Sequence, residues 1–250
     1  MLDVPFSEDE ESLARRRYEE CAQRRESSAT TADEHARRAD ACVEVGTFAL
    51  AFDTACGAHA AFADAADASL ESIEARVRNP TGLEYAALPL HAWRGTYAAL
   101  LAGESARCRA FADAMGRADQ EPDPSVALDD HPFWYATAVT AAAAGADERA
   151  LDTLENTGSG SQWATGTTTL LRGAVDGDRG SVETGLDDLL DYHRERVADT
   201  ARRELHATVF AAEATALTLL AWERGLEYDP ESRFVPSSFL WETLGKLSEN

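Results

Sequence analysis

Histidine is the residue type in this chain best suited to bind a metal or to move a proton at neutral pH. None of the histidines lies in an H-E-x-x-H motif, and none has a glutamate three residues before it. The zinc-protease and di-iron patterns are therefore absent from the sequence. The six histidines are His35, His59, His91, His131, His193 and His206. On these grounds the sequence predicts no metal site, no cofactor and no catalytic residue.

Two arrangements of histidine nevertheless leave alternatives open. His59 follows the spacing of an apolar helix face, which favours a buried histidine with a hydrogen-bond partner over a metal ligand. His193 and His206, with Glu195 and Glu204 close by in the sequence, are conceivable as an acid–base pair. The charges on either side of His193 favour a solvated helix face instead. An enzyme built on these two histidines is the third functional alternative.

Tryptophan is the other residue type that could carry a function, because aromatic side chains anchor both cores and interfaces. Trp93, Trp134 and Trp222 lie within apolar helical segments, so we expect them in the core. Trp163 begins a helix after a glycine-serine loop, and Trp241 lies close to the end of the chain. The sequence predicts Trp163 and Trp241 as contacts for a partner.

Other chemical motifs are missing. The glycine-serine loop at 158–161 has no lysine and follows no strand, so it does not match a phosphate-binding loop. The sequence has no G-x-S-x-G motif of serine hydrolases. The four cysteines form no C-x-x-C pair, and their helical surroundings predict buried free thiols in a reducing compartment.

The charge balance narrows the range of partners. The chain has 250 residues, with 45 acidic and 23 basic residues and a formal net charge of −22. Such a surface repels nucleic acid and anionic membranes, and no apolar run approaches the roughly 18 to 20 residues of a membrane helix. Lys246 is the single lysine. This composition is typical of a cytoplasm that accumulates salt, where the acidity is an adaptation to the solvent.

The elements that must position these residues are helices. Strand signals are scarce. Ser7 is a plausible N-cap for a polar first helix, which runs to about 27 and is expected to be loosely attached or to contact another chain. The N-terminus lacks a secretion signal, which favours a cytoplasmic protein. An apolar stripe from Val45 to Val77 predicts helix with a bend or break near Gly57, stopping at 79–82.

From residue 83 the pattern changes to helical hairpins. In each, a small apolar helix end meets a glycine, then an acidic residue, then a second amphipathic helix. The glycines are Gly103, Gly145 and Gly177. Glycine suits the left-handed position after a helix, and an acid suits the start of the next helix. Repeated hairpins of this kind predict stacked helix pairs that share a core.

The last third of the chain predicts a central helix and a short final one. A strongly apolar segment from about Arg203 to Arg224 is expected to be the most buried helix, capped by Gly225. An extended segment then leads to Pro236 and a final helix. Together the patterns predict an all-α fold, either a multi-helix bundle or an irregular, solenoid-like stack of helical hairpins. We expect one domain spanning 1–250.

The C-terminal third also carries a recognisable arrangement. The apolar helix 213–222 ends in Arg224-Gly225, and a short segment leads to Phe234-Val235-Pro236. This resembles the end of the immunity protein 49 family of bacterial polymorphic-toxin systems, with phenylalanine where a tyrosine is typical. The segments 91–93 and 101–104 are also similar, and the likeness covers about 45–240.

The resemblance implies an all-helical cytoplasmic protein that binds a cognate toxin and neutralises it by steric occlusion, without turnover or cofactor. It implies no functional residues here, because the matching positions look structural. The alternative from the residues alone is a helical-repeat adaptor, similar to tetratricopeptide repeats, that holds a peptide or protein in a groove between 83 and 197. Both hypotheses predict a protein partner, and the sequence leaves the oligomeric state open.

Overall fold

The computed structural model describes residues 6–52, 55–78, 82–120, 130–157, 161–200 and 204–249. Within these ranges the chain forms eleven α-helices, one 3-10 helix and no strand, which confirms the predicted all-α fold. The first seven helices are α1 (Glu8–Arg25), α2 (Ala32–Phe52), α3 (Ala55–Arg78), α4 (Gly82–Ala102), α5 (Ser105–Gln120), α6 (Asp130–Ala143) and α7 (Asp147–Leu154). The others are α8 (Gln162–Asp176), α9 (Arg179–Thr200), η1 (Leu205–Thr208), α10 (Ala212–Glu223) and α11 (Ser237–Glu249).

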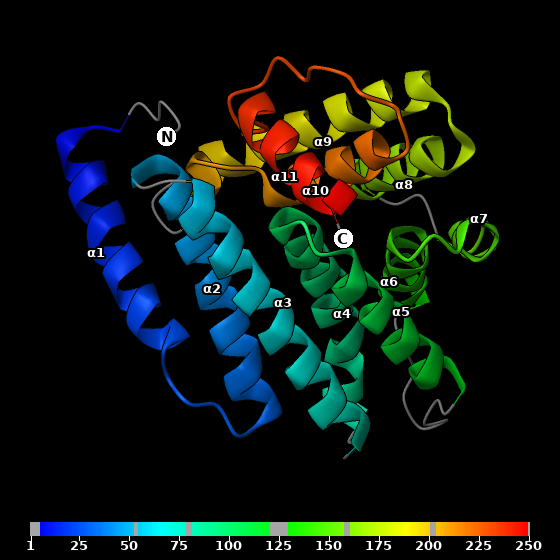
Figure 1. Ribbon diagram of the computed structural model, residues 1–250, viewed down its shortest axis with the longest axis horizontal. Coiled ribbons are helices and arrows are strands. Elements are labelled where there is room, and N and C mark those ends of the chain that lie inside the picture. The colour runs from blue at the N-terminus through cyan, green and yellow to red at the C-terminus, as the bar shows by residue number, and fades with distance from the viewer. Residues whose placement is uncertain are drawn as a thin grey trace.

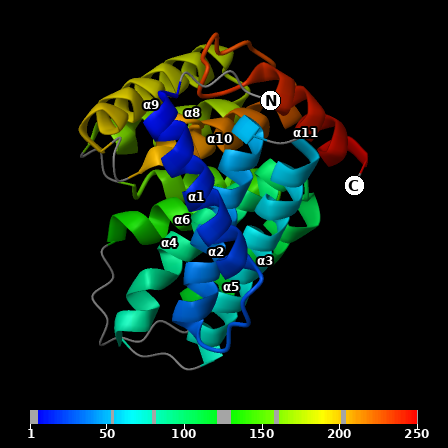
Figure 2. The same ribbon diagram turned by 90° about the vertical axis from the view of Figure 1, so that its left-hand side faces the viewer.

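The helices form two groups, one of which lies across the end of the other in Figure 1. Helices α1 to α4 lie side by side in chain order, and each packs against the next. Helices α8 to α11 lie across one end of this layer, as Figures 1 and 2 both show. Helices α5 and α6 pack against α4, and α7 packs against α6 and α8, so these three helices lead from the first group to the second. The arrangement is a stack of helical hairpins, as the sequence predicts.

Helix α10 is the helix on which the second group is built. It packs against α4, α8, α9 and α11, and its leucines Leu217, Leu219 and Leu220 are fully buried. The buried hydroxyls of Thr215 and Thr218 donate hydrogen bonds to backbone carbonyls one turn earlier, so neither remains unsatisfied. The prediction of a central, buried helix here is confirmed.

The predicted start of that helix is wrong. The sequence suggests a continuous helix from about Arg203, but the chain forms the short helix η1 and only then begins α10 at Ala212. The reason is tertiary: the amide of Ala211 donates to the carbonyl oxygen of Phe234, at 2.9 Å. The returning C-terminal segment thus takes a donor that a continuous helix would use internally.

Helix α1 begins as predicted, because Ser7 and Glu10 form a reciprocal capping box at its N-terminus. The helix packs against α2. Arg17 makes a two-pronged ion pair with Glu44 on α2, with distances of 2.7 and 2.9 Å. Arg25 pairs with Asp64 on α3 at 2.6 Å. Charge pairs therefore help to attach this polar helix, beside the buried side chains of Ala14 and Cys21.

The long apolar stripe of the sequence divides into two helices. Helix α2 ends at Phe52 and α3 begins at Ala55, a few residues before Gly57, so the predicted break is confirmed. Helix α3 ends at Arg78, where the proline-containing segment begins. Phe48 and Phe62 from the stripe are fully buried in the core.

The hairpin turns follow the predicted glycines. Gly103 and Gly177 have φ angles of 77° and 75°, in the left-handed region that favours glycine. The amide after each glycine bonds back to a carbonyl five residues earlier, which closes the end of the helix. The same turn ends α6 and α10.

The hairpin of α8 and α9 is unusually close, because glycines line its interface. A Cβ atom on Gly185 of α9 would lie 2.4 Å from the backbone nitrogen of Leu170 and 2.7 Å from the carbonyl oxygen of Gly166. A Cβ atom on Gly173 of α8 would lie 2.8 Å from the nitrogen of Val182. Backbone therefore packs on backbone between these two helices.

Candidate functional site

A cavity of about 510 Å³ lies where the two groups of helices meet. Its walls come from α2, α3, α4, α8, α9, η1 and α10. Figures 1 and 2 show α9 and α10 across the layer that contains α2 and α4. The volume falls within the range of small-ligand sites. The cavity is therefore the first place to search for function.

Glu213, in the first turn of α10, places a carboxylate on the cavity wall among neutral donors. Its Oε2 atom accepts a hydrogen bond from the indole nitrogen of Trp163 at 2.8 Å. Its Oε1 atom accepts a hydrogen bond from the hydroxyl of Tyr97 at 3.1 Å. The hydroxyls of Tyr97 and Tyr135 also bond to each other. Three helices besides α10 thus contribute to one polar cluster.

The surroundings of Glu213 act on its pKa in opposite directions. Burial raises the pKa of this carboxyl group above its ordinary value, although the hydrogen bonds from Trp163 and Tyr97 act to lower it. The positive charges of Arg94 and Arg196 lower it further, from a distance. Burial also raises the pKa of Tyr97 well above its ordinary value, so this phenol stays protonated and available as a donor.

Aromatic rings surround this carboxylate. Tyr135 lies edge-on to Trp163, with ring centres 5.1 Å apart, and edge-on to Trp93 at 5.4 Å. The rings of Trp93 and Trp163 lie 6.0 Å apart, and both residues line the cavity. Edge-to-face packing of this kind stabilises ring orientations. The aromatic wall beside Glu213 is consequently well defined.

Three histidines line the cavity, and burial acts on each of them. Burial lowers the pKa of His91 and His193 to about 4, and it also lowers the pKa of His206. All three imidazoles are therefore neutral at pH 7. The Nε2–H group of His193 donates to the carbonyl oxygen of Ala207 at 2.9 Å.

The expected solvated position of His193 is wrong. Its ring packs edge-on against Phe234, with centres 4.9 Å apart, and lies between α9 and η1. The neighbouring charges misled the prediction, because Arg194 and Glu195 point outward from the same turn of helix. The structure brings His193 and His206 to one cavity together with Glu204, but not with Glu195.

Arginines neutralise the other carboxylates of the cavity. Arg94 lies 3.5 Å from Asp40, and Arg196 pairs with Glu204. Glu44 accepts the ion pair from Arg17 described above. The donors that surround Glu213 are instead two phenols and an indole. Glu213 thus differs from the other carboxylates of the cavity by having neutral partners.

The two predicted partner contacts occupy different positions. Trp163 lies in the cavity wall, partly buried, with its indole nitrogen on Glu213. Trp241 lies on α11 with 56% of its surface exposed, and its ring packs on Trp222 with centres 4.6 Å apart. The structure does not bring these two tryptophans together in one site. Of the predicted core tryptophans, Trp222 is 3% exposed.

His59 is a core histidine with a partner, as predicted. It is 5% exposed, and its Nε2 atom lies 2.9 Å from the hydroxyl oxygen of Thr243. Cys21, Cys42 and Cys108 are buried free thiols, also as predicted. In the described part of the chain, no group of three metal-ligating side chains is arranged to hold an ion. The side chain of His131, like that of Cys56, lies outside the described residues.

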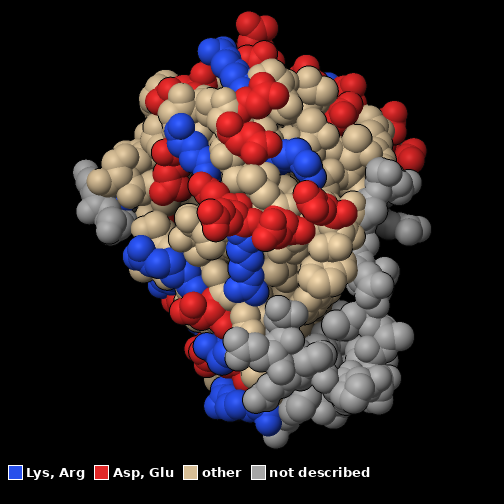
Figure 3. Space-filling view, turned by 90° about the vertical axis from the view of Figure 1, so that its right-hand side faces the viewer, with Lys and Arg blue, Asp and Glu red and all other residues tan. Residues whose placement is uncertain are grey.

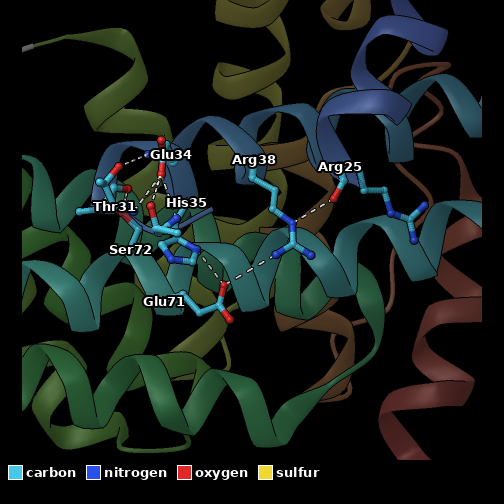
Figure 4. A network of polar contacts seen from close by, with 9 residues as sticks. Arg25, Thr31, Glu34, His35, Arg38, Glu71 and Ser72 are labelled. Carbon is cyan, nitrogen blue, oxygen red and sulfur yellow. Dashed lines mark hydrogen bonds and ion pairs between the residues drawn. The ribbon is translucent and has the colours of Figure 1, made fainter. Parts of the chain in front are cut away.

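A second polar network lies at the N-terminal end of α2 and holds neighbouring helices together. Figure 4 shows His35 beside Glu71, and Arg38 reaching the carbonyl oxygen of Arg25. The Nδ1 atom of His35 lies 2.9 Å from a carboxylate oxygen of Glu71. Glu34 accepts hydrogen bonds from the threonines that precede α2, and these lower its pKa to about 2. The network joins the α1–α2 connection to α3.

Charge on the outer surface is mixed rather than gathered by sign. On the face that Figure 3 shows, acidic side chains lie beside arginines and among uncharged surface. Arg179 and Glu183 on α9 form such a pair at 2.7 Å, and Arg224 and Asp147 form another at 2.8 Å. On this face, acidic and basic side chains are therefore interspersed. None of the described helices is long and apolar enough to cross a membrane.

The fold and the cavity define an all-helical protein of stacked hairpins with an aromatic, carboxylate-bearing cavity at the junction of two helix groups. Its sequence matches the model of immunity protein 49 over residues 38–239, and the chain belongs to this family of immunity proteins. This confirms the resemblance found in the C-terminal third. No curated protein and no solved structure is similar enough to this chain to match it.

Glu213 and its donors were missed by sequence reasoning. The available signal was a single carboxylate in a run of alanine, threonine and leucine that otherwise forms a buried helix. A lone acid in such a run needs hydrogen-bond donors from elsewhere in the fold. Those donors, Tyr97, Tyr135 and Trp163, lie 50 residues or more away in the chain.

Proposed function

We propose that this protein neutralises a toxin by binding it and covering a surface that the toxin needs. Membership of the immunity protein 49 family, over residues 38–239, is the observation that carries the proposal. Binding requires no turnover, and we propose that the protein acts without a cofactor. The preformed core, which extends from Ala14 on α1 to Leu240 on α11, supports a partner surface that needs little ordering on association.

We further propose that Trp241 is part of the contact surface. Large exposed aromatic side chains are enriched at the centres of protein interfaces. Trp241 and Leu13 are the large apolar side chains found exposed among the described residues, at 56% and 38%. They lie on α11 and α1 respectively, so each can be replaced without disturbing the cavity.

The test is co-expression of this chain with toxin genes encoded beside it, scored by growth and by recovery of a complex on size-exclusion chromatography. We expect growth to be rescued and a stable complex to form. Trp241→Ala is expected to weaken the complex by tenfold or more, the loss of an interface hot spot. Leu13→Ala is the matched control, because it also removes an exposed apolar side chain.

Absence of both protection and complex with every adjacent toxin would overturn the proposal. Recovery in molar salt of an endogenous partner unrelated to any toxin would favour the helical-repeat adaptor instead. If Leu13→Ala weakened the toxin complex and Trp241→Ala did not, toxin binding would be supported but the contact surface would be assigned to α1 instead of α11.

A further inference from the structure

The cavity at the junction of the helix groups has a distinctive set of charged and aromatic side chains. It contains four carboxylates, of Asp40, Glu44, Glu204 and Glu213, and two guanidinium groups, of Arg94 and Arg196. With its three imidazoles neutral, the wall carries more negative than positive charge. An anionic ligand would therefore meet net repulsion.

The excess of negative charge is concentrated on one group. Asp40, Glu44 and Glu204 each have an arginine as partner, while the donors on Glu213 are neutral. A carboxylate has about four acceptor positions, two on each oxygen. The two phenols occupy those of Oε1, and the indole of Trp163 leaves room on Oε2 for one further donor from the cavity. A cation is the partner that would complete this site.

The walls beside Glu213 fit an organic cation better than a metal ion. Trp93 and Trp163 line the cavity next to the carboxylate, and aromatic faces attract guanidinium and ammonium groups. A small inorganic cation would need several oxygen ligands at short range. In the described residues no such group of ligands converges here.

We propose that this cavity binds an organic cation, with its guanidinium or ammonium group on Glu213 and against the rings of Trp93 and Trp163. Such a group occurs in free small molecules and on the arginine or lysine side chains of a protein partner. The proposal does not depend on toxin neutralisation, because it concerns an internal site whose ligand can be measured directly.

The test uses the full chain and two probes that differ in charge. L-arginine carries a guanidinium group, and citrulline replaces it with a neutral urea group of nearly the same shape. Binding is followed by calorimetry and by the fluorescence of Trp163 and Trp93, whose rings line the site. We expect arginine to bind at least tenfold more tightly than citrulline. Equal binding of the two, or binding of neither, would overturn the proposal.

A pair of variants locates the site. Glu213→Gln keeps the shape of the side chain and removes its charge, and we expect arginine affinity to fall at least tenfold. Glu71→Gln removes one negative charge from the polar network in Figure 4, outside the cavity, and we expect less than a twofold change. Each variant removes one negative charge, so any weakening of the general attraction between cations and this acidic protein is the same in both. If both variants lost the same arginine affinity, arginine would be binding to the acidic surface at large, and the proposed site would be overturned.

A capped peptide with one central arginine, compared with the same peptide containing citrulline, identifies the source of the cation. Binding of the arginine peptide supports a side chain of a protein partner, and binding of free arginine alone supports a small molecule. If Glu213→Gln fails to fold, the comparison of arginine with citrulline on the unaltered chain still decides the proposal. Failure here would leave toxin binding unaffected, since that is scored separately by growth and complex formation.

Discussion

Replacement of Gly185 by alanine is predicted to destabilise the protein by separating α8 from α9. The new Cβ atom would lie 2.4 Å from the backbone nitrogen of Leu170 and 2.7 Å from the carbonyl oxygen of Gly166. Backbone atoms cannot rotate aside as side chains do. The two helices must therefore move apart locally by about 1 Å to restore van der Waals contact.

The size of the effect follows from two opposing contributions. Forcing an extra methyl group into a packed interface costs about 1 to 3 kcal/mol. Alanine in a helix regains about 0.5 to 1 kcal/mol relative to glycine. We expect a net loss of about 1 kcal/mol, which corresponds to a fall in Tm of roughly 2 to 4 °C for a chain of this size.

Urea denaturation and thermal unfolding, both followed by circular dichroism, measure this loss. Gly180→Ala is the matched control on the same helix, since the Cβ atom would meet only Asp178, at 3.4 Å. The control is expected to be neutral or more stable by up to about 1 kcal/mol. A Gly185→Ala protein as stable as the parent, or a Gly180→Ala protein equally weakened, would refute this account of the α8–α9 interface.

Further predictions concern caps, protons, thiols and salt. Ser7→Ala should cost about 1 kcal/mol in urea denaturation, because it removes the capping box of α1; no loss would show that this end of the helix is frayed. The free energy of unfolding should decline as the pH falls from about 6.5 towards 4. In the folded protein His91 and His193 have pKa values of about 4 and stay neutral over this range, whereas in the unfolded chain they bind protons. The variant His193→Gln should flatten that decline, and an unchanged pH dependence would contradict the burial of this ring. Burial raises the pKa of Cys42 and Cys108 to about 12, so peptide mapping after treatment with iodoacetamide should find both unmodified until the protein is denatured. Tm should rise as potassium chloride is raised from about 0.1 M to 1 M. The Debye length then shortens from about 10 to 3 Å, so repulsion within a chain of net charge −22 is screened. A Tm that does not change with salt would contradict the view that the acidity is an adaptation to a salty solvent.

Local patterns were sufficient to predict most of the helices. The turns at Gly103 and Gly177 depend on residues within five positions of the glycine, and both were predicted. The start of α10 was not, because it depends on the hydrogen bond from Ala211 to Phe234, which the chain brings together only on folding. Helix propensity alone favours a helix that continues through this segment.

The cavity could not be predicted for a similar reason. Its walls join Asp40 on α2 to Glu213 on α10 through side chains from seven elements, and no local spacing links them. Trp163 was predicted as a partner contact from the loop that precedes it, and the structure places it in the cavity wall beside Glu213. Sequence patterns describe residues that are close together along the chain, whereas this site consists of residues that only the folded structure brings together.

The central position of α10 has a consequence for the order of events during biosynthesis. Helices α1 to α9 leave the ribosome before residues 212–223, so the faces of α4, α8 and α9 that α10 covers stay open until late in translation. The cavity that contains Glu213 forms only after this helix docks. The site at Glu213 is therefore absent from a nascent chain until residues 212–223 have emerged and packed against α4, α8 and α9.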